Sequence, residues 1–197
     1  MLTSIRISLL MLALMIPTSL AANPAETVST YHDQLLQSIR DSAGKTDMVR
    51  YSSLAPAMDA AFDFESMIKT AVGTHWGKAS VESQKALLEA FRRVSIATYA
   101  DQFAGLTSGA FIIKGSRSGP RGLQLVDCEL KTGDENVAIS YVVRNKNGEW
   151  LIVDVLLKGG ISELALRASE YASTLKKGGT EALTRTLNEQ ATALLAH

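Results

Sequence analysis

The repeat of apolar residues changes its period near Gly105, and this change limits the folds that the chain can adopt. Before this point, apolar residues recur every three or four positions, as on one face of a helix. After it, short runs alternate apolar and polar residues with the period of two that is typical of half-buried strands. The sequence therefore predicts an α+β fold, in which a shell of helices packs against an antiparallel sheet.

Capping and breaking residues divide the helical parts of the chain. Ser80 and Ser162 stand where helix N-caps are expected, and Gly73 and the Gly178-Gly179 pair stand where helices end. Together with the apolar spacing, they predict helices at residues 25–43, 47–73 with a break at Pro56, 80–103, 162–177 and from 180 onward.

Four strands are expected at residues 110–114, 122–130, 136–145 and 149–157. Their connections are short, and Gly133-Asp134 and Asn147-Gly148 supply residues that adopt positive φ between paired strands. An antiparallel meander of about four strands is the simplest topology. Alternation along the third strand places four apolar side chains on one face of the sheet, namely Val137, Ile139, Tyr141 and Val143.

The first 22 residues are typical of a secretory signal. Arg6 precedes an apolar run at residues 7–16 that is too short to span a bilayer, and Ser19-x-Ala21 fits the rule for cleavage. We expect a signal peptide at 1–22 and a single domain at 23–197, outside the cytoplasm. An uncleaved N-terminal anchor is the alternative.

Charge and cysteine content exclude several classes of protein. The sequence has 20 basic and 20 acidic side chains, and loss of Arg6 with the signal removes one of the basic ones. The remaining chain is almost neutral and has no basic tract, so nucleic acid is not an expected partner. Cys128 is the single cysteine, so no intramolecular disulfide can form. We interpret Cys128 as a small buried hydrophobic residue rather than a reactive thiol.

The usual signatures of catalysis and metal binding are missing from the sequence. It contains no HExxH, CxxC or GxSxG motif and no glycine-rich phosphate loop, so no metal or cofactor is expected. His32 is predicted to face solvent, and His75 to have a structural role. Asp154 interrupts an apolar strand, and we expect it to bind backbone or an arginine such as Arg144 or Arg121.

Three segments resemble the MlaC family of periplasmic phospholipid-binding proteins, also called the toluene-tolerance auxiliary family. They read FDFESMIKTAVGTHW, EAFRRVSIATYADQF and GEWLIVDVLLKGGISELALRASEY. The last of them is similar to the hopanoid-associated branch, HpnM. In order and spacing, the three cover most of the chain after the signal.

This resemblance implies a periplasmic lipid shuttle without covalent catalysis. The cargo, a phospholipid or a hopanoid-type lipid, is expected in an apolar cavity between the helices and the sheet. Implied partners are an inner-membrane ABC transporter complex with an MCE-domain component and an outer-membrane lipoprotein complex, with transient proximity to the membrane.

The expected cavity wall consists of apolar residues whose helix or strand face should point between the two layers. These are Phe64, Met67, Val72, Trp76, Phe91, Tyr99, Phe103, Tyr141, Val143, Ile152 and Leu156. Each has an ordinary core role as its alternative, because periodicity reports burial and not a void. Rim residues such as Lys114 or Arg121 are candidates for headgroup contacts.

Two other functions are compatible with the same helices, sheet and apolar residues. An enzyme acting on an apolar substrate, such as an isomerase or hydrolase, would use Asp154 or His75 as its base. A non-ligand adaptor in envelope assembly would have a solid core and an exposed apolar patch for a protein partner.

Overall fold

The computed structural model describes residues 23–106, 108–133 and 135–196, so the expected signal peptide at 1–22 lies outside the described residues. The described chain begins with five helices, which are α1 (Pro24–Asp41), α2 (Asp47–Ala61), α3 (Phe64–Val72), α4 (Thr74–Lys78) and α5 (Val81–Gln102). The strands follow as β1 (Ala110–Ser118), β2 (Gln124–Lys131), β3 (Asn136–Lys146), β4 (Glu149–Leu157) and β5 (Ile161–Ser162), and α6 (Glu163–Leu194) completes the fold.

Side-chain caps fix the helix starts where the sequence places them. The Ser80 hydroxyl accepts a hydrogen bond from the Ser83 backbone N–H at 3.1 Å, and the Ser162 hydroxyl accepts one from Ala165 at 2.9 Å. Each bond satisfies one of the N–H groups that a helix start leaves unpaired. The predicted starts of α5 and α6 are confirmed, as is the end of α3 at Gly73, whose φ is 54°.

The predicted break at Pro56 is wrong, because α2 runs through this residue from Asp47 to Ala61. A proline removes one backbone hydrogen bond from a helix. Burial of Leu54, Ala57 and Met58 on the core side of α2 outweighs that loss, since tertiary packing supplies most of a helix's stability.

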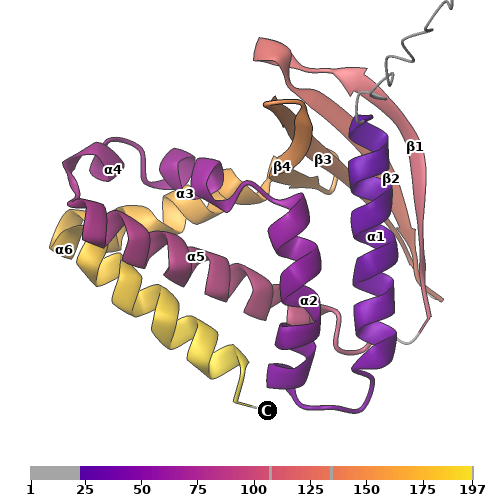
Figure 1. Ribbon diagram of the computed structural model, residues 1–197, viewed down its shortest axis with the longest axis horizontal. Helices are drawn as coiled ribbons and strands as arrows, with labels where there is room; N and C mark the ends of the chain where they lie inside the picture. The colour runs from indigo at the N-terminus through magenta and orange to yellow at the C-terminus, as the bar shows by residue number, and fades with distance from the viewer. Residues whose placement is uncertain (1–22, 107, 134, 197) are drawn as a thin grey trace, which may run out of the picture.

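The interruption at Gly178-Gly179 is confirmed. Both glycines leave the helical conformation, with φ of −151° and 64°, and divide α6 into two halves. Positive φ carries little steric penalty for Gly179, which has no Cβ. In Figure 1, the first half runs away from the sheet and the second half returns beside α5.

The sheet is an antiparallel meander in the order β1-β2-β3-β4-β5, as predicted, with the short β5 added at one edge. Asn147 and Gly148 both have positive φ, of 56° and 98°, and form the tight turn between β3 and β4. Ile139, Tyr141 and Val143 are buried in the main core, which confirms the apolar inner face.

A β-bulge changes the phase of β4 relative to β3. Tyr141 pairs with Val155, but Val143 pairs with Ile152, so the β4 segment between these pairs contains one extra residue, Val153. Beyond the bulge, the inward and outward positions of β4 are exchanged relative to simple alternation.

The bulge makes the predicted inward orientation of Leu156 wrong. Leu156 packs with Leu125, Val142 and Val153 in a small cluster on the outer face, apart from the main core. Its neighbour Val155 is the residue that faces inward and is buried in the main core.

The helices form two groups around the sheet (Figure 1). Helix α1 packs on the inner face of β1, β2 and β4, with α2 beside it. Helices α3 to α6 form a second group that extends away from the sheet. Within this group α5 packs on α3 and α6, and it also packs on α2 of the first group. This second group meets the sheet mainly at β4.

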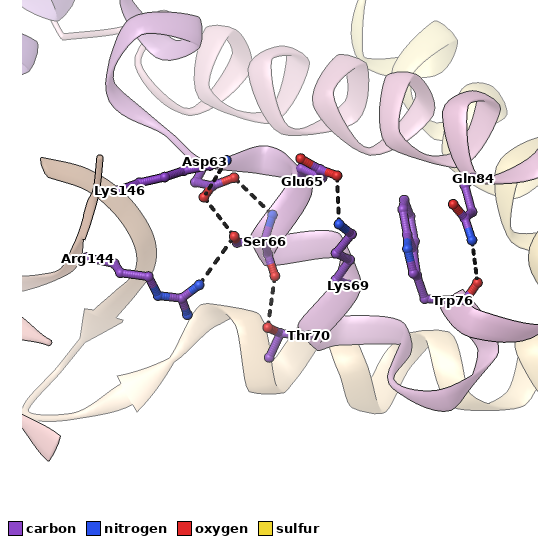
Figure 2. A network of polar contacts seen from close by, with 9 residues as sticks. All are labelled: Asp63, Glu65, Ser66, Lys69, Thr70, Trp76, Gln84, Arg144 and Lys146. Atoms are coloured by element: carbon purple, nitrogen blue, oxygen red, sulfur yellow. Dashed lines mark hydrogen bonds and ion pairs between the residues drawn. The ribbon is translucent and has the colours of Figure 1, made fainter. Parts of the chain in front are cut away.

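Asp63 anchors the second group to the sheet at the connection between α2 and α3 (Figure 2). Its backbone N–H donates to the Ile152 carbonyl at 2.9 Å. Its buried carboxylate accepts bonds from the Ser66 N–H at 3.0 Å, the Ser66 hydroxyl at 2.7 Å and the Lys146 ammonium at 3.2 Å. Burial raises the pKa of Asp63, but these bonds outweigh it and leave the pKa below its ordinary value.

His32 is buried, and its predicted exposure is wrong. Only 3% of the residue is exposed, and its ring stacks on Phe111 with the centroids 3.9 Å apart. His32 lies four residues after Val28 and three before Leu35, so it shares their buried helix face. Burial lowers the pKa of His32 to about 4.

Cys128 is buried, as interpreted from the sequence, and burial followed by the nearby Asp127 raises its pKa to about 12. Within the described residues, no helix combines the length and apolar character needed to cross a membrane.

Candidate functional site

An enclosed cavity of about 20 Å³ lies where four helices meet β4. Its lining comes from α3, α5, α6, β4 and the end of α2, and consists of Met58, Phe62, Phe64, Met67, Ser95, Tyr99, Val155, Glu163, Leu164 and Arg167. A space of this size holds about one water molecule. The lining is mostly apolar, which is the composition of a site for a hydrophobic ligand.

Aromatic rings form much of the cavity wall. Phe62 stacks on Phe64 with the centroids 5.6 Å apart, and Tyr99 meets Phe62 edge-on at 6.0 Å. Phe64 in turn meets Phe91 edge-on at 6.2 Å. These contacts link α3 and α5 through side chains whose packing is largely non-directional.

Ser95 introduces an unpaired polar group into this apolar space. Its residue is 4% exposed, and its hydroxyl has no hydrogen-bond partner among the described residues. An unsatisfied buried hydroxyl destabilises a protein by roughly 1–3 kcal/mol. The Ser95 hydroxyl is therefore available to a polar atom of a ligand.

Glu163 and Arg167 lie one turn apart on α6 and also reach the cavity. Burial raises the pKa of Glu163, against the opposing effect of Arg167. For Arg167, burial lowers the pKa, but Tyr171 and Glu163 leave it above its ordinary value, so the guanidinium stays charged. The guanidinium also lies over the ring of Phe91, 5.8 Å from its centroid.

The same two charged residues line an open groove of about 490 Å³ on the other side. The groove runs between α5 and the two halves of α6, and its lining is Val94, Thr98, Glu163, Leu166, Arg167, Glu170, Tyr171, Gln190, Ala193 and Leu194. Because Glu163 and Arg167 belong to both linings, they stand between the groove and the enclosed cavity.

A second groove, of about 620 Å³, lies between α1, the end of α2 and the start of β4. Among the described residues, its lining has no member in common with that of the enclosed cavity. Of these two grooves, the one beside α6 is therefore the one that shares lining residues with the enclosed cavity.

The predicted wall residues occupy three kinds of position. Phe64, Met67 and Tyr99 line the enclosed cavity. The core around it contains Val72, Phe91, Tyr141, Val143 and Ile152, with the half-buried Trp76 and Phe103 packed against this core. Leu156 lies on the outer face of the sheet, for the reason given above.

Several cavity residues lay outside the predicted wall. Val155 was not predicted as a wall residue, because the bulge in β4 reverses the alternation that the sequence suggests. Glu163 and Arg167 could have been predicted from the sequence, since they fall four residues apart on the face of α6 that also carries Tyr171. Charged residues on an apolar helix face point to a functional site or a buried ion pair.

Of the two residues considered for catalysis, Asp154 holds the start of α6 and His75 lies away from the cavity. The Asp154 carboxylate accepts bonds from the Ser162 hydroxyl at 2.6 Å and the Leu164 N–H at 3.1 Å, so it binds the start of α6, as one sequence interpretation expected. His75 is half-buried on α4 and lines neither the cavity nor the groove beside α6. In the described part of the chain, no cluster of acidic, histidine or cysteine side chains is suited to a metal ion.

The predicted headgroup residues lie away from this site. Lys114 forms an ion pair with Glu129 at 3.0 Å, and Arg121 belongs to the turn between β1 and β2. Neither lines the cavity or the groove beside α6.

Comparison with known proteins relates this architecture to a family. The chain is similar to the solved structure of a phospholipid-binding protein from Ralstonia solanacearum in complex with a phospholipid, with a TM-score of 0.78 and 24% sequence identity. The alignment covers 88% of this chain and 99% of that one, and it shows a shared fold. No curated protein sequence matches the chain. The profile of the MlaC protein family matches residues 29–189, and the chain therefore belongs to the MlaC family.

Proposed function

We propose that this protein carries a lipid, with the acyl chains held between the α3–α6 group and the sheet. The observation that carries the proposal is the apolar cavity lined by Phe64, Met67 and Tyr99, which shares Glu163 and Arg167 with a surface groove. The phospholipid bound to the Ralstonia solanacearum protein of the same fold supports this interpretation.

Physical chemistry explains the need for such a carrier. A two-chain lipid exposes on the order of thirty methylenes to water, at about 0.8 kcal/mol each, which gives a barrier on the order of 25 kcal/mol. A cavity with aliphatic and aromatic walls removes most of this barrier. Carrying a lipid in such a cavity needs no catalytic residue.

Loading requires the cavity to expand well beyond 20 Å³. The α3–α6 group meets the sheet mainly at β4, and Asp63 fixes one end of the group there. We infer that the group moves outward about this end, and that the acyl chains replace the contacts that Met58, Met67 and Val155 make in the closed form. Methionine suits this role because its flexible thioether adapts to irregular partners.

The cellular setting that we propose is the periplasm, after removal of residues 1–22. There the protein shuttles a phospholipid or a hopanoid-type lipid between the outer and inner membranes. Its proposed partners are an outer-membrane lipoprotein complex and an inner-membrane ABC transporter complex with an MCE-domain component.

Native mass spectrometry of protein purified from its own periplasm tests the proposal, followed by identification of whatever dissociates. We expect one two-chain phospholipid or one triterpenoid per protein. A protein that is empty and also takes up neither lipid from vesicles would overturn the carrier function and favour the adaptor.

A vesicle assay separates a shuttle from a protein that only stores lipid. Donor vesicles contain a self-quenched fluorescent phospholipid, and acceptor vesicles contain none. We expect catalytic amounts of protein to accelerate the appearance of fluorescence. Stoichiometric binding without faster transfer would contradict the shuttle.

A further inference from the structure

The groove beside α6 is lined by acidic and basic side chains, which follow one another from its inner end toward solvent. Glu163 and Arg167 lie at its inner end, where they also border the enclosed cavity. Glu170 follows one turn later on the same helix and is exposed. The groove thus offers a cation beside a carboxylate near the interior, and a second carboxylate nearer to solvent.

Arg167 has few protein partners for its charge. Its guanidinium carries five N–H donors in a planar fork. Among the described residues, its neighbours include the Phe91 ring, the hydroxyl groups of Tyr171 and Tyr99, and the through-space charge of Glu163. A planar fork of this kind suits a phosphate, which accepts two parallel hydrogen bonds from it.

A second donor lies on the cavity side of Arg167. The Ser95 hydroxyl lines the same cavity, is 4% exposed and has no hydrogen-bond partner among the described residues. A buried hydroxyl without a partner is unfavourable unless a ligand supplies one. Because Ser95 lines the cavity and not the groove, an ester oxygen that lies past Arg167, on the cavity side, would satisfy it.

The two glutamates restrict which phosphate group fits. The groove has two acidic residues, Glu163 and Glu170, against one basic residue, Arg167. A headgroup with a net negative charge would bring further negative charge toward these carboxylates. A headgroup that carries an ammonium beyond its phosphate would instead place opposite charges beside Arg167 and Glu170, which are neighbours at i and i+3.

We propose that this groove binds a zwitterionic phospholipid headgroup, with the phosphate at Arg167, the ammonium at Glu170, and an ester oxygen of the same lipid at Ser95 on the cavity side. The proposal rests on the lipid-carrying function proposed above. It assigns the cargo to phosphoaminolipids, in preference to anionic phospholipids and to uncharged lipids.

Competition among three lipids with identical acyl chains tests this assignment. Vesicles contain equal amounts of dioleoyl phosphatidylethanolamine, dioleoyl phosphatidylglycerol and dioleoylglycerol, and native mass spectrometry measures which lipid the protein takes up. We expect enrichment of phosphatidylethanolamine over phosphatidylglycerol of about threefold, the size of a partly exposed charge interaction. We expect dioleoylglycerol to be disfavoured by about tenfold or more.

Variants assign the two preferences to separate residues. Glu170→Gln should remove the preference between the two phospholipids, and Arg167→Gln should reduce the preference for phospholipid over dioleoylglycerol. If Arg167→Gln does not fold, Arg167→Lys replaces it in this test, because it retains the charge and removes the planar fork. Glu189→Gln removes an exposed glutamate on the same helix, outside the groove, and should change neither ratio.

The outcomes distinguish failure of this inference from failure of the proposed function. Uptake in the proportions of the vesicle, or preference for phosphatidylglycerol or dioleoylglycerol, would overturn the headgroup assignment and leave lipid carriage standing. Equal ratios in the parent and Glu170→Gln would also overturn it. Failure to take up any of the three lipids would overturn the carrier function itself.

Discussion

The Nε2 atom of His32 lies 3.0 Å from the hydroxyl oxygen of Tyr141. Both side chains are buried, and the contact joins α1 to the inner face of β3. Phe111 of β1 stacks on the face of the imidazole. This arrangement keeps His32 neutral inside the core, which gives the fold a dependence on pH.

The free energy of unfolding should fall as the pH decreases from about 6.5 to about 4. Burial lowers the pKa of His32 from 6.5 to about 4, so the unfolded chain binds the proton more readily in this window. The full effect is on the order of 3 kcal/mol, at about 1.4 kcal/mol per pKa unit. Urea unfolding of the parent and of His32→Gln at several pH values measures it.

His32→Gln should remove this part of the pH dependence, whereas His75→Gln should retain the parental slope, because His75 lies on α4 outside the main core. Equal slopes in the parent and His32→Gln between pH 4 and 6.5 would contradict the assignment.

Asp63→Ala should lower the free energy of unfolding by about 2 kcal/mol, since it removes the cap of α3 and leaves Lys146 without its carboxylate. Asp63→Asn retains a capping oxygen and should lose less. Asp33→Ala, an exposed change on α1, should stay within about 0.5 kcal/mol of the parent. A loss for Asp63→Ala no larger than that of Asp33→Ala would exclude the anchoring role.

Ser95→Ala should raise the free energy of unfolding of the empty protein by about 1 kcal/mol, because it removes a buried hydroxyl that has no partner. Ser83→Ala on the same helix is the matched control. The Ser83 hydroxyl donates to Glu181 at 2.8 Å, so its loss should have the opposite sign. Equal destabilisation by both changes would show that Ser95 is satisfied in solution.

Local sequence signals predicted much of the fold because each one reports an interaction between near neighbours. The caps at Ser80 and Ser162, the kink at Gly178-Gly179 and the turn at Asn147-Gly148 all depend on residues within one or two turns. The apolar face of β3 follows in the same way from its alternation.

The errors arose where a distant partner decides the outcome. The bulge in β4 follows from pairing with β3, so the sequence could not show that Val155 faces inward and Leu156 outward. His32 looked exposed because its polar character hid a position beside the buried Val28 and Leu35. Periodicity also failed to separate Phe64 and Tyr99, which line the cavity, from Val72 and Val143, which are ordinary core residues.

Methionine methyl groups give the most direct test of lipid binding inside the fold. Residues 23–197 contain three methionines, of which Met58 and Met67 line the enclosed cavity and Met48 is 48% exposed on α2. With ¹³C-methyl-methionine labelling, we expect loading with a phospholipid to shift the Met58 and Met67 methyl resonances and to produce cross-relaxation with acyl-chain protons, while Met48 stays unchanged. Stoichiometric lipid that leaves Met58 and Met67 unshifted, or that contacts Met48 instead, would contradict an interior site between the helices and the sheet.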